Sequence, residues 1–139
     1  MKGIYMLNNK PLAFIIEDDE SQANLFSEAL EQAEFEVEII RDGKKALSRL
    51  GSATPDIVVL DINLPYVSGV DILRHIRHDE RLVKTRVIIA SANSQVAATL
   101  HNEADLVLTK PVSYFQLRDL ATRFRSRRDD GGVEKSPSS

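Results

Sequence analysis

Residues 56–65, with the sequence DIVVLDINLP, restrict the possible folds more than any other stretch of the chain. Four apolar residues, three of them β-branched, lead directly to the carboxylate of Asp61, and a turn with Pro65 and Gly69 follows. A short, continuous apolar run bounded by turn residues is typical of a buried strand in a parallel sheet. The pattern therefore predicts a strand that presents Asp61 in the loop at its carboxyl end.

The composition limits the classes of protein to which the chain can belong. It has 139 residues, of which 42% are hydrophobic and 28% charged, as expected for one globular domain with a hydrophobic core. The net charge of −3 implies no general affinity for nucleic acid or for anionic membranes. The chain has no cysteine, which excludes disulfides, thiolate zinc sites and cysteine nucleophiles.

The two ends of the sequence are polar and differ from its middle. We expect residues 1–11 to form a short lead-in, residues 12–127 one domain, and residues 128–139 a disordered tail rich in Gly, Ser and charge. The first residues lack the apolar centre of a signal peptide, and no apolar run approaches the roughly 20 residues of a membrane span. The sequence therefore predicts a cytoplasmic protein without a membrane partner.

Short apolar runs alternate with helical patterns throughout the predicted domain. The runs predict strands at residues 12–16, 35–41, 86–90 and 106–109, in addition to the strand within 56–65. Apolar residues three and four apart predict helices, and the first and last of these cover residues 21–34 and 114–127. Their apolar faces are predicted to contain Leu25, Phe26, Ala29, Leu30 and Ala33, and Phe115, Leu117, Leu120, Ala121 and Phe124. This alternation predicts an α/β fold, a doubly wound parallel sheet of five strands flanked by five helices.

Polar side chains follow four of the five predicted strands. Glu17, Asp18 and Asp19 follow the first strand and Asp61 the third, while Ser91 follows the fourth and Lys110-Pro111 the fifth. In a doubly wound sheet the carboxyl ends of the strands lie at one edge, where ligands bind. Any α/β protein has some polar residues in these loops. Acids after two of the strands, a hydroxyl after another and a lysine after a fourth are harder to attribute to chance than a single acid after one strand.

These residue types are suited to phosphoryl transfer. Clustered carboxylates repel one another, and a divalent cation bound between them relieves the repulsion. Oxygen ligands favour Mg²⁺, or Mn²⁺, over zinc. An ionised Asp61 can attack phosphorus in line, while Lys110 pairs with phosphoryl oxygens and the hydroxyl of Ser91 donates a hydrogen bond to another.

Four motifs occur in a fixed order along the chain. They are IIEDDE at residues 15–20, VVLDINLP at residues 58–65 with Gly69, IIASA at residues 88–92, and the Lys110-Pro111 pair. From about residue 12 to residue 125 the chain thereby resembles the response-regulator receiver domain of two-component signalling. The resemblance implies a flavodoxin-like sheet with strand order 2-1-3-4-5. It also implies a sensor histidine kinase or a histidine phosphotransfer protein as phosphodonor, and an output protein or domain as the regulated partner.

The resemblance also implies a role for each residue at the metal and phosphorylation site. Asp61 is the phosphorylated aspartate, and it ligates Mg²⁺ together with Asp18. Glu17 acts on the metal through water, and the backbone carbonyl of Asn63 completes the protein ligands. Asp19 is left as a third acid that is solvated or caps the first helix.

The switch residues match the family's pattern only in part. Ser91 is the implied switch hydroxyl, and Lys110, before an implied cis Lys110–Pro111 bond, is the implied phosphoryl contact. Val107 stands where Tyr or Phe is usual, which puts the usual aromatic rearrangement in question. Tyr66 stands where Gly is frequent, and it either shields the acyl phosphate from water or is an exposed loop residue.

The sequence therefore predicts a phosphoacceptor domain that switches its surface, with slow self-dephosphorylation but no turnover of an outside substrate. One alternative is a receiver-like binding module with weakened switching. Another is a phosphohydrolase of the haloacid-dehalogenase type, which the Asn63 position and the short chain disfavour. Direct binding to nucleic acid is not expected.

Overall fold

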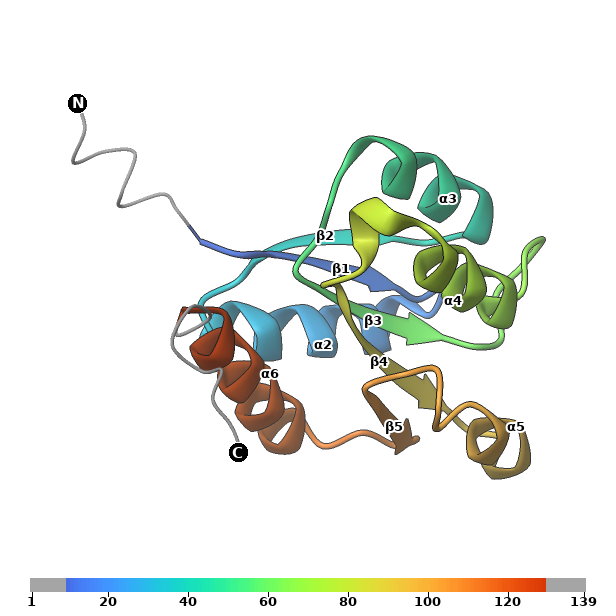
Figure 1. Cartoon of the computed structure of the whole chain (residues 1–139). Coiled ribbons are helices and arrows are strands. Elements are labelled where there is room, and N and C mark those ends of the chain that lie inside the picture. Colours follow the sequence, from blue (N-terminus) through green and yellow to red (C-terminus); the bar gives the residue numbers. More distant parts are fainter. Residues whose placement is uncertain (1–9, 130–139) are drawn as a thin grey trace.

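The computed structural model describes residues 10–129 as a parallel α/β sheet with helices on both sides (Figure 1). The strand order is β2-β1-β3-β4-β5, and every neighbouring pair is parallel. The strands are β1 (Leu12–Ile16), β2 (Glu36–Ile40), β3 (Ile57–Asp61), β4 (Arg86–Ser91) and β5 (Leu106–Thr109). The helices are α2 (Glu20–Gln32), α3 (Gly43–Ser52), α4 (Gly69–His78), the 3₁₀ helix η1 (Glu80–Leu82), α5 (Ser94–Thr99) and α6 (Tyr114–Asp129). The predicted fold class and strand order are confirmed.

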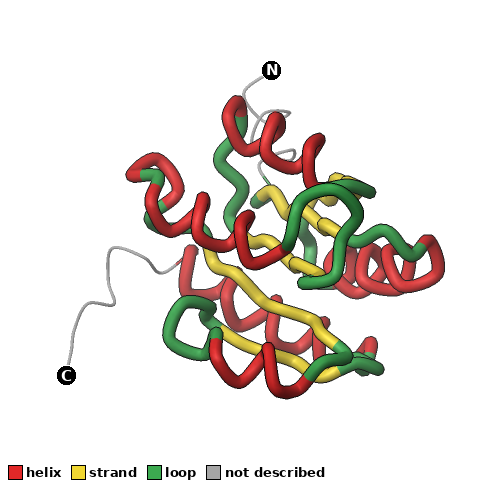
Figure 2. Tube along the Cα trace, turned by 90° about the vertical axis from the view of Figure 1, so that its right-hand side faces the viewer, coloured by secondary structure: helices red, strands yellow, loops and turns green. Residues whose placement is uncertain are grey.

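Alternate residues of the central strands bury their side chains on opposite faces of the sheet. Ile15 and Val59 pack on one face with α2 and α6, whereas Ile16 and Leu60 pack on the other with α3 and α4. Figure 2 shows the helices on either side of the strands. Burial on both faces explains why β1, β3 and β4 are continuous apolar runs rather than alternating ones.

The strand register brings the predicted site residues to one edge of the sheet. Ile16 pairs with Leu60, so the residues that follow β1 lie beside Asp61 at the end of β3. Asp61 pairs with Ala90, and Ser91 with Thr109, so Ser91 and Lys110 reach the same edge. The architecture alone therefore gathers side chains that are far apart in the sequence.

Two side chains predicted to lie on apolar helix faces are exposed instead. Leu25 in α2 is 37% exposed and Phe115 in α6 is 62% exposed. The buried stripe of α2 passes through Ala23, Phe26 and Leu30, and Leu25 lies beside it. Phe115 lies two residues before the buried Leu117, about 200° around the helix, and so points away from the sheet.

The predicted boundaries need small corrections. The first helix begins one residue earlier than predicted, because Asp19 caps it, and it ends at Gln32, before Glu34 with its positive φ of 69°. The last helix continues to Asp129, two residues beyond the predicted domain end. Most of the predicted lead-in and tail, residues 1–9 and 130–139, lies outside the described residues. Among the described residues, no helix is long and apolar enough to cross a membrane.

Candidate functional site

Asp61 is a buried acid at the end of the central strand β3. It is 5% exposed, and its Oδ1 accepts a hydrogen bond of 3.1 Å from the backbone N–H of Asn63. The chain turns back at Gly69, whose N–H donates to the carbonyl of Ile62 at 3.0 Å. A Cβ on Gly69 would collide with the carbonyl oxygen of Asp61 and lie 2.6 Å from the Cα of Ile62. This glycine therefore lets the start of α4 pack directly against the strand end that carries Asp61.

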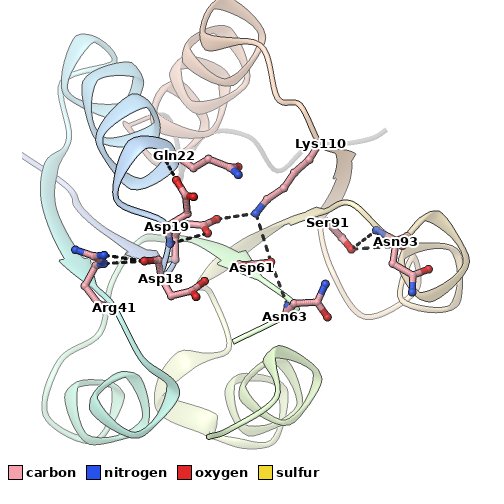
Figure 3. Close-up of polar contacts among 10 residues, drawn as sticks. Asp18, Asp19, Gln22, Arg41, Asp61, Asn63, Ser91, Asn93 and Lys110 are labelled. Carbon is pink, nitrogen blue, oxygen red and sulfur yellow. Dashed lines mark hydrogen bonds and ion pairs between the residues drawn. The ribbon is translucent and has the colours of Figure 1, made fainter. Parts of the chain in front are cut away.

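Three carboxylates converge at this edge of the sheet. Oxygens of Glu17, Asp18 and Asp61 all lie within 4.8 Å of one another. Figure 3 shows where Asp18 and Asp61 lie at this edge. Glu17 is 1% exposed, whereas Asp18 is solvent-exposed at the rim. Oxygen donors at this spacing, open to water on one side, suit a hard divalent cation such as Mg²⁺. The acidic cluster predicted from the sequence therefore exists and can hold a metal.

Lys110 lies between two of these acids. Its Nζ is 3.0 Å from Oε1 of Glu17 and 3.5 Å from Oδ1 of Asp61. Its side chain is 13% exposed, and its backbone N–H donates to the carbonyl of Ser91 at 2.9 Å. The Lys110–Pro111 bond is cis, as the family resemblance implied. Lys110 thus points toward Asp61, and its predicted contact with a phosphoryl group stays a prediction.

The surroundings of Glu17 shift the pKa of its carboxyl group. Burial raises the pKa of its carboxyl, and the nearby charge of Asp61 raises it further. Hydrogen bonds from Lys110 and from the backbone N–H of Asp19 act in the opposite direction, and the net shift is upward. The lysine that contacts Glu17 therefore favours its ionised form and opposes the effect of burial on its pKa.

Ser91 reaches the predicted edge, but its hydroxyl faces another residue. It is fully buried, and its Oγ accepts from the N–H of Asn93 at 3.0 Å and lies 3.3 Å from the carbonyl of Asn93. The side chain of Asn93 caps α5 by accepting from the N–H groups of Gln95 and Val96. The hydroxyl of Ser91 is therefore coupled to the start of α5, and its predicted contact with a phosphoryl group stays a prediction.

The loop between β1 and α2 contains a contact that sequence reasoning missed. Asp19 caps α2 by accepting from the N–H of Gln22 at 2.9 Å, which was one of the two predicted alternatives. Arg41, which no sequence motif identifies as a site residue, donates from Nη2 and Nε to the backbone carbonyl of Asp18 at 2.7 and 3.2 Å. Arg41 directly follows β2, the neighbour of β1 in the sheet. Its place after a strand could have identified it, but a single arginine carries no motif.

The structure shows the surroundings of the two residues that differ from the family's pattern. Val107 is half-buried and packs against the core on the α3 and α4 face of the sheet. Tyr66 is 83% exposed, and its ring lies 5.5 Å from the Nζ of Lys44. These contacts favour the alternative of an exposed loop tyrosine over that of a shield above Asp61.

Comparisons with known proteins show the family to which the chain is related. The family model described as the response regulator receiver domain matches residues 13–122. Over 124 residues the chain is 34% identical to the transcriptional regulatory protein TrcR of Mycobacterium tuberculosis, with 88% of this chain and 47% of TrcR covered. Over 115 residues it is 34% identical to the response regulator ArlR of Staphylococcus saprophyticus, with 81% and 50% covered. The chain thus spans about half the length of these relatives.

A solved structure of a receiver domain has the same fold as this chain. The BeF3-activated receiver domain of DrrB, a Thermotoga maritima OmpR/PhoB homologue, is 27% identical to this chain, with a TM-score of 0.76. The match covers 85% of this chain and 99% of that domain. The similarity in fold therefore extends over most of this chain.

Proposed function

This chain belongs to the response regulator receiver domain family of two-component systems, and from that premise we propose that Asp61 accepts a phosphoryl group in a Mg²⁺-dependent reaction. The observation that carries the proposal is the position of Asp61, buried in an acidic cluster and 3.5 Å from the Nζ of Lys110. A structural role for Asp61 would not need two further carboxylates beside it, because clustered acids repel one another and Lys110 is a single counter-charge for three of them.

The transfer step follows from the groups at the site. A carboxylate oxygen of Asp61 forms a bond to phosphorus while the bond from phosphorus to the donor's imidazole nitrogen breaks. The imidazole leaves with the electron pair of that bond and takes up a proton from water. Asp18, Asp61 and the backbone carbonyl of Asn63 would hold Mg²⁺, with Glu17 acting through water, and the metal would supply neutralisation of charge on the phosphoryl oxygens.

Lys110 and Ser91 would respond to the new phosphoryl group. Lys110 is within 3.5 Å of Asp61 and is placed to pair with an oxygen of a phosphoryl group on it. Ser91 would rotate its hydroxyl from Asn93 to another phosphoryl oxygen, which removes a contact to the residue that caps α5. Phosphorylation would thereby shift an equilibrium between two conformations of the surface around α5 and β5.

The donor would be a sensor histidine kinase or a histidine phosphotransfer protein, and the output would be another protein or domain. The chain would act as a signalling domain that slowly dephosphorylates itself rather than as an enzyme with an outside substrate. Val107, in place of an aromatic side chain, favours a second candidate, a receiver-like binding module whose switching is weakened.

Incubation with Mg²⁺ and acetyl phosphate, followed by intact-mass measurement, tests the proposal. We expect one base-labile phosphoryl adduct in the natural chain and in Asp71→Asn, a control that removes an exposed acid of α4. Asp61→Asn should give no adduct. Rapid phosphate release without accumulation of an adduct would indicate a hydrolase instead, whereas the absence of both an adduct and phosphate release would indicate a binding module without phosphoacceptor chemistry.

A further inference from the structure

Arg41 contacts the backbone of Asp18, a residue of the acidic cluster. Its guanidinium donates from Nη2 at 2.7 Å and from Nε at 3.2 Å, and both bonds end on the carbonyl oxygen of Asp18 (Figure 3). A guanidinium presents its donors in a rigid plane, so two bonds to one oxygen restrict the orientation of that peptide more than a single bond does.

The loop that carries Asp18 is short and is held at both ends. On one side, the N–H of Glu17 donates to the carbonyl of Ile40 at the end of β2 at 3.1 Å. On the other side, Asp19 caps α2. Asp18 lies between these anchors and is exposed, whereas Glu17 and Asp61 are held by burial. The bonds from Arg41 therefore act on the carboxylate of the cluster that the core does not hold in place.

We propose that Arg41 is a positioning residue for the cation site, which keeps the backbone of Asp18 in place so that its carboxylate stays beside Asp61. This inference rests on the proposed function, because it assumes that the acidic cluster binds Mg²⁺. Arg41 would not touch the metal or the phosphoryl group, and it would act through the peptide of Asp18.

The charge of Arg41 predicts an effect of the opposite sign, which makes the inference testable. Arg41 contacts the peptide of Asp18, and a positive charge near the acidic cluster weakens the attraction of the cluster for a second cation. If Arg41 acted through its charge alone, its removal would tighten Mg²⁺ binding. If Arg41 acts by holding the loop, its removal weakens Mg²⁺ binding in spite of the more favourable charge.

Calorimetric titration of the unphosphorylated full chain with MgCl₂ distinguishes the two. Arg41→Ala should weaken Mg²⁺ binding about tenfold, as is usual when a group that orients a metal ligand is lost. Arg41→Lys should recover part of that loss, because an ammonium can make one of the two bonds. Arg74→Ala removes an arginine whose side chain is 55% exposed, on α4, and should leave the affinity unchanged.

Amide hydrogen exchange in the metal-free protein provides a second measurement. Arg41→Ala should speed exchange at residues 18–22 and leave the amides of β3 and β4 unchanged, which also establishes that the variant is folded. Equal or tighter Mg²⁺ binding by Arg41→Ala would overturn the positioning role alone. Absence of Mg²⁺ binding by the natural chain would instead overturn the proposed function on which the inference rests.

Discussion

At the scale of single residues, close contacts with the backbone around Asp61 limit the size of the side chains that fit in the neighbouring loops. Gly69 lies against the backbone of Asp61 and Ile62, and Gly43 at the start of α3 lies against Val67. Tyr66 adopts a positive φ of 72°, a conformation that residues other than glycine rarely take. The loop after β3 is therefore held by backbone packing on two sides and strained at its tip.

Gly69→Ala should destabilise the fold and disturb Asp61. The new Cβ would lie 2.6 Å from the Cα of Ile62, and a backbone atom cannot move aside as a flexible side chain can. We expect a loss on the order of 1–3 kcal/mol in the free energy of unfolding, measured with urea. Gly51→Ala in α3 is the matched control: nothing lies within 4 Å of its Cβ, and it should raise stability by up to about 1 kcal/mol.

Tyr66→Gly should stabilise the fold, because glycine removes the cost of a positive φ while the exposed ring loses few contacts. The expected gain in unfolding free energy is roughly 0.5–1 kcal/mol after allowance for the greater freedom of glycine in the unfolded chain. Tyr66→Ala, which loses the ring but keeps the strain, serves as the comparison. A glycine variant no more stable than the alanine variant would argue against strain at this position.

At the scale of elements, arginines join helices to their neighbours at connecting loops. Arg77 of α4 donates to the carbonyls of Glu103 and Thr85 at 2.6 and 3.1 Å and to Oδ2 of Asp105 at 3.0 Å. Asp105 in turn accepts from the backbone N–H of Val87 at 2.7 Å, which ties the start of β5 to β4. These bonds fix α4 to the connection between α5 and β5, the segment that the proposed switch would move.

The ion pair between β2 and α3 should make stability depend on pH. Hydrogen bonding to Arg49 lowers the pKa of Glu38 below its ordinary value of 4.5, and the two contacts measure 2.7 and 2.8 Å. Since the pKa is lower in the folded state, the stabilisation is complete above the unfolded pKa and is lost as the pH falls through the folded one. Glu38→Gln should therefore be less stable than the natural chain at pH 7, with a difference that disappears in acid.

Urea unfolding of both chains over a series of pH values measures this effect. In an Arg49→Met background, Glu38→Gln should change stability less, since the partner is already absent. A stability difference that stayed constant between neutral and acidic pH would show that Glu38 acts through packing rather than through its charge.

At the scale of the whole molecule, the sheet order gathers residues from four strand ends into one site. Because β1 and β3 lie inside the sheet and are buried on both faces, Glu17 and Asp61 at their ends are held by the core, whereas Asp18 is exposed at the rim. Three carboxylates in such a place repel one another, with Lys110 as a partial counter-charge. The folded protein therefore retains electrostatic repulsion among these carboxylates, which a bound cation would reduce.

Mg²⁺ should stabilise the whole fold, and EDTA should remove the gain. At a free Mg²⁺ concentration ten times its dissociation constant, linkage predicts about 1.4 kcal/mol of added unfolding free energy. Asp18→Asn should largely lose this dependence. Thermal unfolding with and without Mg²⁺ provides the measurement, and equal midpoints for the natural chain would mean that the cluster binds no metal in the folded state.

The fold was predictable because its signals are local in the sequence. Apolar runs that end at acids, at Ser91 and at Lys110 marked the strands, and Asp19 was recognised as a possible cap. The predicted edge of the sheet and the acidic cluster followed from the rule that parallel strands end together. The family resemblance supplied the strand order and the cis bond before Pro111, both of which are confirmed.

The exposure and the hydrogen-bond partners of several side chains were decided by tertiary structure alone. The apolar periodicity could not determine that Leu25 and Phe115 face water, because the width of a buried stripe depends on what packs against it. The hydroxyl of Ser91 turns to Asn93, and Arg41 reaches the backbone of Asp18 from another strand. The sequence by itself determined that the acids, Ser91 and Lys110 meet at the sheet edge, although it did not identify Arg41. How their side chains are oriented there depends on neighbours that only the folded chain brings within hydrogen-bonding distance.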